Sequence, residues 1–226
     1  MQLFYSKDIL SSSSLDSNES KHCISVLRKN INDIIYVTDG NGCLYKCTIE
    51  SFEKKIVKLK IKEKEKKNQN KNIQLAVAFP KKRNRIEWML EKITEIGVNE
   101  IHPIICNNSE RKKINFERCE KILISSMKQS FNTCLPKIHE IQTFTKFVKS
   151  NKCKKKYIAH CDRSDNRKMI ELEKEKNICI MIGPEGDFSD KEITLAKENN
   201  FIAIKLSENR LRTETAAIVA CYKLML

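Results

Sequence analysis

The chain is short of the residues that make tight turns: its 226 residues include only five glycines and four prolines. It also has no apolar run near the roughly 20 residues that a membrane-spanning helix requires. The N-terminal stretch MQLFYSKDIL lacks the basic segment and apolar stretch of a secretory signal. These absences predict a globular protein of the cytoplasm with no membrane partner.

Cysteine is abundant, with ten residues, but no two of them form a C-x-x-C pair. Several lie in apolar segments, where a free cysteine acts as a small hydrophobic side chain. Zinc sites and disulfide frameworks depend on closer and more regular spacings. The pattern therefore predicts reduced thiols and no metal site.

Basic residues outnumber acidic ones, with 43 Lys and Arg against 29 Asp and Glu and a net charge of +14. Lysine and arginine side chains that neutralise phosphates release counterions, so this excess favours binding to a polyanion such as nucleic acid. The alternative is a lysine-rich surface that is merely solvated. Charge alone leaves both interpretations open.

The segment KEKEKKNQNKN, residues 62–72, contains no apolar residue and divides the chain into two parts. Before it, short strand-like runs dominate, such as IIYVT (34–38) and the alternating KIVKLKIK (55–62). They predict a small β-barrel over residues 1–70. After it, apolar strand-like runs alternate with helical patterns, which predicts an α/β domain with a mostly parallel sheet over residues 71–226.

The stretch ICIMIGPEGDF, residues 178–188, places two of the few glycines, Gly183 and Gly186, directly after an apolar run. Ligands of open parallel sheets bind at the carboxyl ends of strands, and glycine lets a ligand approach the main chain closely. The motif is neither G-x-G-x-x-G nor a P-loop, so it lacks the phosphate donors of both. By itself it fits a ligand loop and a tight structural turn equally well.

A second polar loop, LSENRLRTETAA (206–217), follows the apolar run FIAIKL in the same way. It holds Arg210, Arg212 and Glu214, and Thr213 offers a hydroxyl group for helix capping. The alternative interpretation is a capped helix preceded by a solvated loop. Two such loops at neighbouring strand ends favour a binding site.

Together, IGPEGDFSDKE and LRTETAA resemble the RsmE family of 16S ribosomal RNA uracil-N3 methyltransferases, which belongs to the SPOUT class. Weaker matches run through nearly the whole chain in order: His22 with Val26-Leu27-Arg28, Asp39-Gly40-Asn41-Gly42, Pro80-Lys81, Lys92 with Thr94-Glu95 and Gly97-Val98, Ser109-Glu110-Arg111, Gln129-Ser130 and Leu135-Pro136. The chain departs from the family pattern at Asp187, where a second glycine is usual. It departs again at Ser207, Asn209 and Arg210, in a loop that usually reads L-G-x-R-I-L-R.

The resemblance implies a C-terminal SPOUT α/β domain with a trefoil knot, preceded by a PUA-like β-barrel that binds RNA. It implies S-adenosylmethionine as cofactor, 16S rRNA or the small ribosomal subunit as partner, and a homodimer in which each site is completed across the interface. The residues that we expect to contact the cofactor are Ile182, Gly183, Glu185, Gly186, Leu206, Ser207, Leu211, Thr213 and Ala216.

Methylation at uracil N3 requires removal of the N3 proton or stabilisation of the anion that its loss creates. Arg212 is the candidate for stabilising that charge, and Glu214 is the candidate for accepting the proton. For Glu214, holding Arg212 or capping the last helix is an equal alternative. A SPOUT ribose 2′-O-methyltransferase and an RNA-binding factor without catalysis remain open as other functions.

Basic residues in both parts of the chain are candidates for RNA contact. Arg28 and His22 are those in the first part, although His22 fits a packing role equally well. Lys81, Arg83 and Arg85 gather at the start of a predicted helix and suit phosphate. A merely solvated basic face is the alternative for that cluster.

Overall fold

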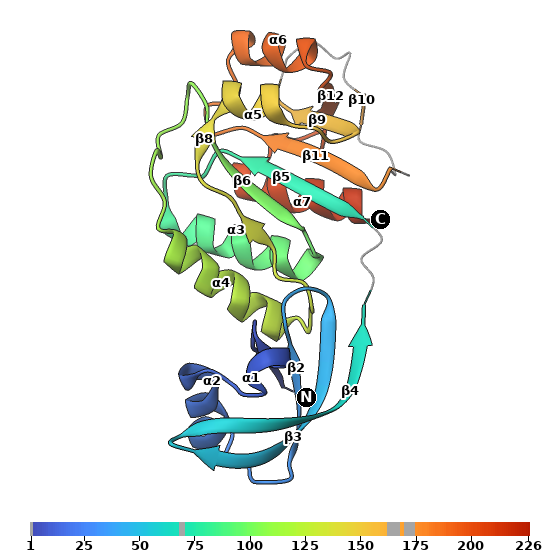
Figure 1. Ribbon diagram of the computed structural model, residues 1–226. Helices are drawn as coiled ribbons and strands as arrows, with labels where there is room; N and C mark the ends of the chain where they lie inside the picture. Colours follow the sequence, from blue (N-terminus) through green and yellow to red (C-terminus); the bar gives the residue numbers. More distant parts are fainter. Residues whose placement is uncertain (1, 68–70, 162–167, 170–174) are drawn as a thin grey trace. The chain divides into compact units, whose positions relative to one another are not determined.

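The computed structural model describes residues 2–67, 71–161, 168–169 and 175–226 (Figure 1). Contacts between Cα atoms divide the chain into two compact units. The first consists of residues 1–69 and 124–135, and the second of residues 70–123 and 136–226. Among the described residues, no helix is both long and apolar enough to cross a membrane.

The first unit is built on a four-stranded sheet in the order β1 (Leu3–Tyr5), β2 (Ile34–Thr38), β3 (Cys43–Glu53) and β4 (Ile56–Lys66). β1 pairs parallel with β2, and the other pairs are antiparallel. Between β1 and β2 the chain forms α1 (Ile9–Ser12), α2 (Ser17–Lys21) and the π-helix η1 (His22–Val26). Alternate strand residues, such as Tyr45, Cys47 and Ile49, face one buried core, as period-two patterning predicts.

The second unit contains a parallel sheet whose strands are ordered β10-β12-β9-β11-β5-β6-β7, with β8 paired to β6. The strand bounds are β5 (Asn72–Val77), β6 (Glu100–Ile105), β7 (Lys137–Ile138), β8 (Gln142–Thr143), β9 (Lys155–Ala159), β10 (Lys168–Met169), β11 (Asn177–Ile182) and β12 (Ile202–Lys205). The three central strands β9, β11 and β5 carry buried apolar runs, because helices cover both faces of a parallel sheet.

The helices of the chain's α/β part are α3 (Arg83–Ile96), α4 (Phe116–Gln129), α5 (Phe144–Ser150), α6 (Asp190–Glu198) and α7 (Thr213–Met225). α5 and α6 contact each other and share a core with one set of alternate strand residues, including Cys179 and Met181. α7 packs against α3 and against β5 and β11. α4 begins in the second unit, and its turns from Ile124 onward belong to the first.

Local signals set one end of each of two helices, α3 and α6. α3 ends at Gly97, which adopts a left-handed φ of 98° that a side chain would disfavour. α6 begins with a capping box in which the hydroxyl of Ser189 accepts a bond from the main chain of Glu192, and the Glu192 carboxylate accepts one from the main chain of Ser189. This capping box fixes where the chain leaves the loop after β11.

Candidate functional site

The loops 183–187 and 206–212 lie at the carboxyl ends of β11 and β12, with the end of β9 between them. Two adjoining cavities, of about 200 Å³ and about 240 Å³, lie between these loops. Both are lined by Ala159, Cys161, Arg210, Leu211 and Ala216. This is the edge at which open parallel sheets bind their ligands.

Hydrogen bonds tie the two loops together. The hydroxyl of Thr213, at the start of α7, donates to the carbonyl oxygen of Gly183 at 3.0 Å and is buried. Arg210 Nη2 donates to the carbonyl oxygen of Glu185, also at 3.0 Å. The start of α7 is therefore fixed to the end of β11, and the cavity walls have a defined separation.

The two glycines of the GPEG turn are needed for close packing. A Cβ atom at Gly183 would lie 3.1 Å from the Phe188 ring, and one at Gly186 would lie 3.1 Å from Cβ of Asn108. The Asn108 amide also donates to the carbonyl oxygens of Gly186 and Asp187, both at 3.0 Å. The side chains of Phe188 and Asn108 therefore pack directly against the main chain of the GPEG turn, in the space that the two glycines leave.

The strained position in this turn is Asp187, whose φ is 62°. This is where the family pattern usually has glycine, which adopts that conformation freely. Aspartate tolerates it better than most residues do. Here the Asp187 carboxylate also accepts hydrogen bonds from the main-chain nitrogens of Cys161, at 2.6 Å, and of Phe188, at 2.8 Å. These bonds stabilise the turn without the glycine.

The structure brings the predicted cofactor residues together around the two cavities. Every one of them except Gly186 is part of a cavity wall: Ile182, Gly183, Glu185, Leu206, Ser207, Leu211, Thr213 and Ala216. Gly186 lies outside the lining and is exposed. The sequence did not single out Ala159, the last residue of β9, or Cys161, which follows β9 by two residues. The strand-like run KKYIAHC (155–161) could have identified them, because the carboxyl end of that strand lies next to the carboxyl ends of β11 and β12.

Arg212 and Glu214 differ sharply in their surroundings. Arg212 is exposed and lines one cavity, and its side chain makes no hydrogen bond or ion pair with any residue that the structure describes. Glu214 is buried, and its Oε1 atom lies 3.4 Å from Nε of Arg85. Its Oε2 atom has no hydrogen-bond partner within the described part of the chain. The partner of Glu214 is thus Arg85, whereas the sequence suggested Arg212.

The residues predicted to contact RNA lie in both units. Arg28 is exposed, and Nε2 of the half-buried His22 lies 3.3 Å from the Gln2 side-chain amide. In the second unit, Arg83 is exposed and Lys81 forms an exposed ion pair with Glu110.

Arg85, at the same helix start, instead contacts two carboxylates of the site. Its Nε atom faces Glu214, and its Nη1 atom lies 3.9 Å from Oε1 of Glu185. A role for Arg85 in RNA contact stays a prediction alongside this internal one.

Comparison with known protein families agrees with this geometry. An RNA methyltransferase domain family matches residues 66–225, and an RNA methyltransferase PUA domain family matches residues 15–62. A curated relative, the ribosomal RNA small subunit methyltransferase E of Buchnera aphidicola subsp. Acyrthosiphon pisum, is 31% identical over 212 residues, which cover 90% of this chain and 84% of the relative. The chain belongs to the RsmE family.

Solved structures of RsmE-like proteins superpose on nearly the whole chain. A probable rRNA methyltransferase from Porphyromonas gingivalis is 36% identical with a TM-score of 0.90, and the match covers 98% of this chain and 95% of that one. The RsmE protein from Neisseria gonorrhoeae, crystallised with S-adenosyl methionine, is 28% identical with a TM-score of 0.82 at the same coverage. The predicted fold class, a mostly parallel α/β domain together with an N-terminal PUA domain, is confirmed.

Proposed function

We propose that this chain is an S-adenosylmethionine-dependent methyltransferase that modifies N3 of a uridine in 16S ribosomal RNA. The observation that carries the proposal is the convergence of loops 183–187 and 206–212 on one pair of cavities, in a chain of the RsmE family. The rRNA specificity is supported by the names of the curated relatives, and the cofactor by the S-adenosyl methionine in the N. gonorrhoeae structure.

The residues around the cavities suit this cofactor. Leu206, Leu211 and Ala216 supply apolar walls for an adenine ring, and the exposed residues Glu208 and Asn209 line the same cavity. The departures at Ser207, Asn209 and Arg210 leave this space open, because all three residues line the cavity of about 200 Å³ instead of filling it. When bound, the cofactor supplies an electrophilic methyl group on its sulfonium.

Arg212 and Glu214 are the residues that act on the uracil base. Loss of the N3 proton leaves a negative charge shared with the two neighbouring carbonyl oxygens of the base. Arg212 stabilises this charge, because its guanidinium lines the cavity and no described carboxylate competes for it. Glu214 Oε2 has no hydrogen-bond partner among the described residues, which leaves it able to accept the proton.

We also propose which residues bind the RNA and that the protein forms a homodimer. His22, Arg28, Lys81 and Arg83 hold the RNA through its phosphates, and the target base leaves its stack to reach the cavity. The protein acts in the cytoplasm as a homodimer. Exposed apolar side chains on the packed pair α3 and α7, Trp88 on α3 and Tyr222 on α7, support an interface there.

The test is methyl transfer to small ribosomal subunits and to protein-free 16S rRNA that lack the modification. Labelled S-adenosylmethionine reports transfer, and nucleoside mass spectrometry with primer extension identifies the atom. Methylation at N3 blocks reverse transcription because it occupies the pairing edge of the base. We expect a single stop at a uridine, in one or both substrates.

Two results would contradict the proposal. Ribose methylation, which leaves primer extension intact, would identify a SPOUT 2′-O-methyltransferase. A folded protein that binds RNA but neither binds the cofactor nor transfers a methyl group would be a non-catalytic RNA-binding factor.

A further inference from the structure

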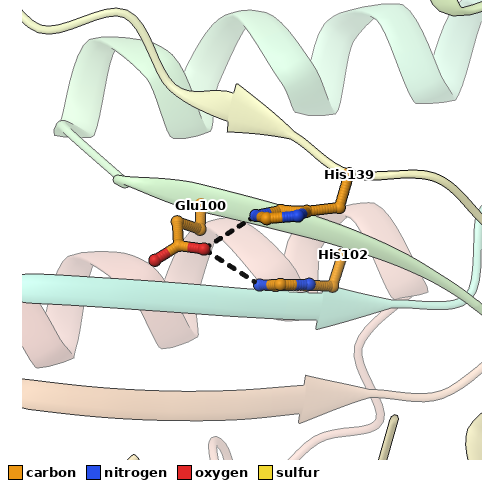
Figure 2. A group of neighbouring side chains, drawn as sticks. All are labelled: Glu100, His102 and His139. Carbon is orange, nitrogen blue, oxygen red and sulfur yellow. Dashed lines mark hydrogen bonds and ion pairs between the residues drawn. The ribbon is translucent and has the colours of Figure 1, made fainter. Parts of the chain in front are cut away.

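Three polar side chains meet in the second unit near the start of β6, at the opposite end of the sheet from the cavities (Figure 2). Glu100 and His102 project from the same face of β6 because they are two residues apart. β6 pairs in parallel with β7, and His139 directly follows β7, where its main-chain nitrogen donates to the carbonyl oxygen of Ile101 at 2.9 Å. Strand register thus places His139 beside His102.

The two imidazole rings share one carboxylate oxygen. Glu100 Oε2 lies 2.7 Å from Nε2 of His139 and 3.5 Å from Nε2 of His102. The rings stack, with centroids 4.0 Å apart and an angle of 11° between their planes. One ligand atom from each of the three side chains lies within 4.8 Å of the others.

His102 is nearly buried, at 8% exposure, and lies against the ring of Phe147. Within the ranges that the structure describes, neither of its ring nitrogens has a hydrogen-bond partner. The 3.5 Å contact with Glu100 is at the limit of a hydrogen bond. A buried imidazole left in this state is costly, and such a group calls for an ion or a water molecule as its partner.

A second layer of side chains orients the carboxylate. The Gln74 amide nitrogen donates to Glu100 Oε1 at 3.0 Å, and the Asn151 amide nitrogen donates to the Gln74 carbonyl oxygen at 3.0 Å. Oε1 is thereby occupied, and Oε2 is turned toward the two histidines. Outer hydrogen bonds of this kind are typical of groups that bind metal ions.

We propose that Glu100, His102 and His139 bind a divalent transition-metal ion, with Zn²⁺ as the best match and water as the fourth ligand. Two imidazole nitrogens and one carboxylate oxygen are a common donor set for tetrahedral zinc. Zinc at its usual bond lengths separates its ligand atoms by about 3.3 Å, between the two contacts that Glu100 makes here. Cysteine spacing in the sequence predicts no metal site, whereas this group of side chains is assembled by strand pairing.

Binding requires a small rearrangement. A metal ion lies in the plane of each imidazole that binds it, so the stacked rings must turn apart. His139 has the room to move, because its side chain is 26% exposed and it follows a strand of only two residues. The ion would then hold β7 to β6, where hydrogen bonds of a two-residue strand alone give little stability.

The test uses the purified full-length chain after treatment with a chelator. Zn²⁺ is titrated in competition with a chromophoric chelator, and Co²⁺ spectra report which ligands are bound. The variants are His139→Ala and Glu100→Gln, with Gln74→Met as a test of the second layer. His22→Ala, which removes a histidine from the other unit, is the matched control.

We expect one ion per chain and a Co²⁺ spectrum without thiolate charge-transfer bands. His139→Ala and Glu100→Gln should weaken binding at least about 100-fold, and Gln74→Met about 10- to 100-fold. Zinc should raise the melting temperature of the wild type and of His22→Ala but not that of His139→Ala. Equal affinity in the wild type and His139→Ala, thiolate ligation, or no binding at all would overturn the proposal.

Discussion

Two glutamates of the α/β unit are placed at opposite ends of the sheet and are held by different partners. Glu214, at the start of α7, faces the guanidinium of Arg85, which keeps its charge at every physiological pH. Glu100, at the start of β6, faces two imidazoles, whose charge and metal binding depend on conditions. Arg85 therefore holds Glu214 as a permanent ion pair, whereas His102 and His139 can bind and release a metal ion together with Glu100.

The two carboxylates also differ in their distance from the cavities. Glu214 lies beside loops 183–187 and 206–212, where the cavities open. Glu100 lies among strand side chains and is held by Gln74. Substitutions near Glu214 should therefore change methyl transfer, whereas substitutions near Glu100 should change stability and leave methyl transfer intact.

The largest expected effect is that of Arg212→Ala on catalysis. Removing a preorganised charge that stabilises an anionic transition state costs about 10²- to 10³-fold in kcat. Because the Arg212 side chain is exposed and forms no hydrogen bond or ion pair with a described residue, the melting temperature should stay unchanged. Single-turnover methyl transfer and thermal unfolding measure the two quantities, with Lys197→Ala on α6 as a surface control. A fully active Arg212→Ala variant would show that Arg212 does not stabilise the anion formed at uracil N3.

The next effect is on stability at the same end of the sheet. Arg85→Met leaves the Glu214 carboxylate buried without its cation, which in a closed site costs about 3–5 kcal/mol. The Arg85 side chain is 25% exposed, so water screens part of this cost, and we expect about 2 kcal/mol. Denaturant unfolding measures it.

The double variant Arg85→Met with Glu214→Gln is the control for that experiment. It removes the unpaired charge and should recover more than half of the lost stability. An Arg85→Met variant as stable as the wild type would mean that the Arg85–Glu214 contact contributes little.

The cavity end of the sheet could be predicted from the sequence because its signals are local. A strand, a glycine turn and a capping box follow one another from Ile178 to Glu192, and each has its own pattern. Arg212 lies in a motif that is contiguous along the chain. Even the unusual Asp187 has a local cause, since its φ of 62° is the conformation for which the family uses glycine.

The other end could not be predicted in the same way, because its residues meet only through strand pairing. Glu100 and His102 are close in sequence, but His139 follows a two-residue strand that has no pattern of its own. The partner of Glu214 was missed for a similar reason. Arg85 lies on α3, far along the chain, and it reaches Glu214 because α3 packs against α7.

A smaller effect should follow Glu100→Gln in the presence of a chelator. The variant loses a charged contact with His139 in which both side chains are about one quarter exposed. We expect about 1 kcal/mol of destabilisation, or a melting temperature about 2–4 °C lower. Glu110→Gln, which removes an exposed ion pair with Lys81, should change stability by less than about 0.5 kcal/mol. Equal shifts in the two variants would mean that the contact between Glu100 and His139 stabilises the protein no more than an exposed ion pair does.

The smallest perturbation is chemical labelling of Cys161, which tests where the cofactor binds without changing the fold. Of the chain's ten cysteines, Cys161 is the exposed one, and it lines both cavities. Burial raises the pKa of Cys23 and Cys47 to about 11, so at pH 8 their reactive thiolates are about 1,000-fold scarcer than the thiols. Iodoacetamide should therefore modify Cys161 first, and the Cys161→Ser variant should resist this rapid reaction.

S-adenosylhomocysteine at saturating concentration should slow this modification at least about 10-fold, because a ligand in either cavity covers the sulfur. Peptide mass spectrometry follows the rate at each cysteine. Protection of Cys161 alone would place the cofactor at the Glu214 end of the sheet. An unchanged rate with bound S-adenosylhomocysteine would place the cofactor elsewhere, and the two glutamates would then no longer separate function from stability.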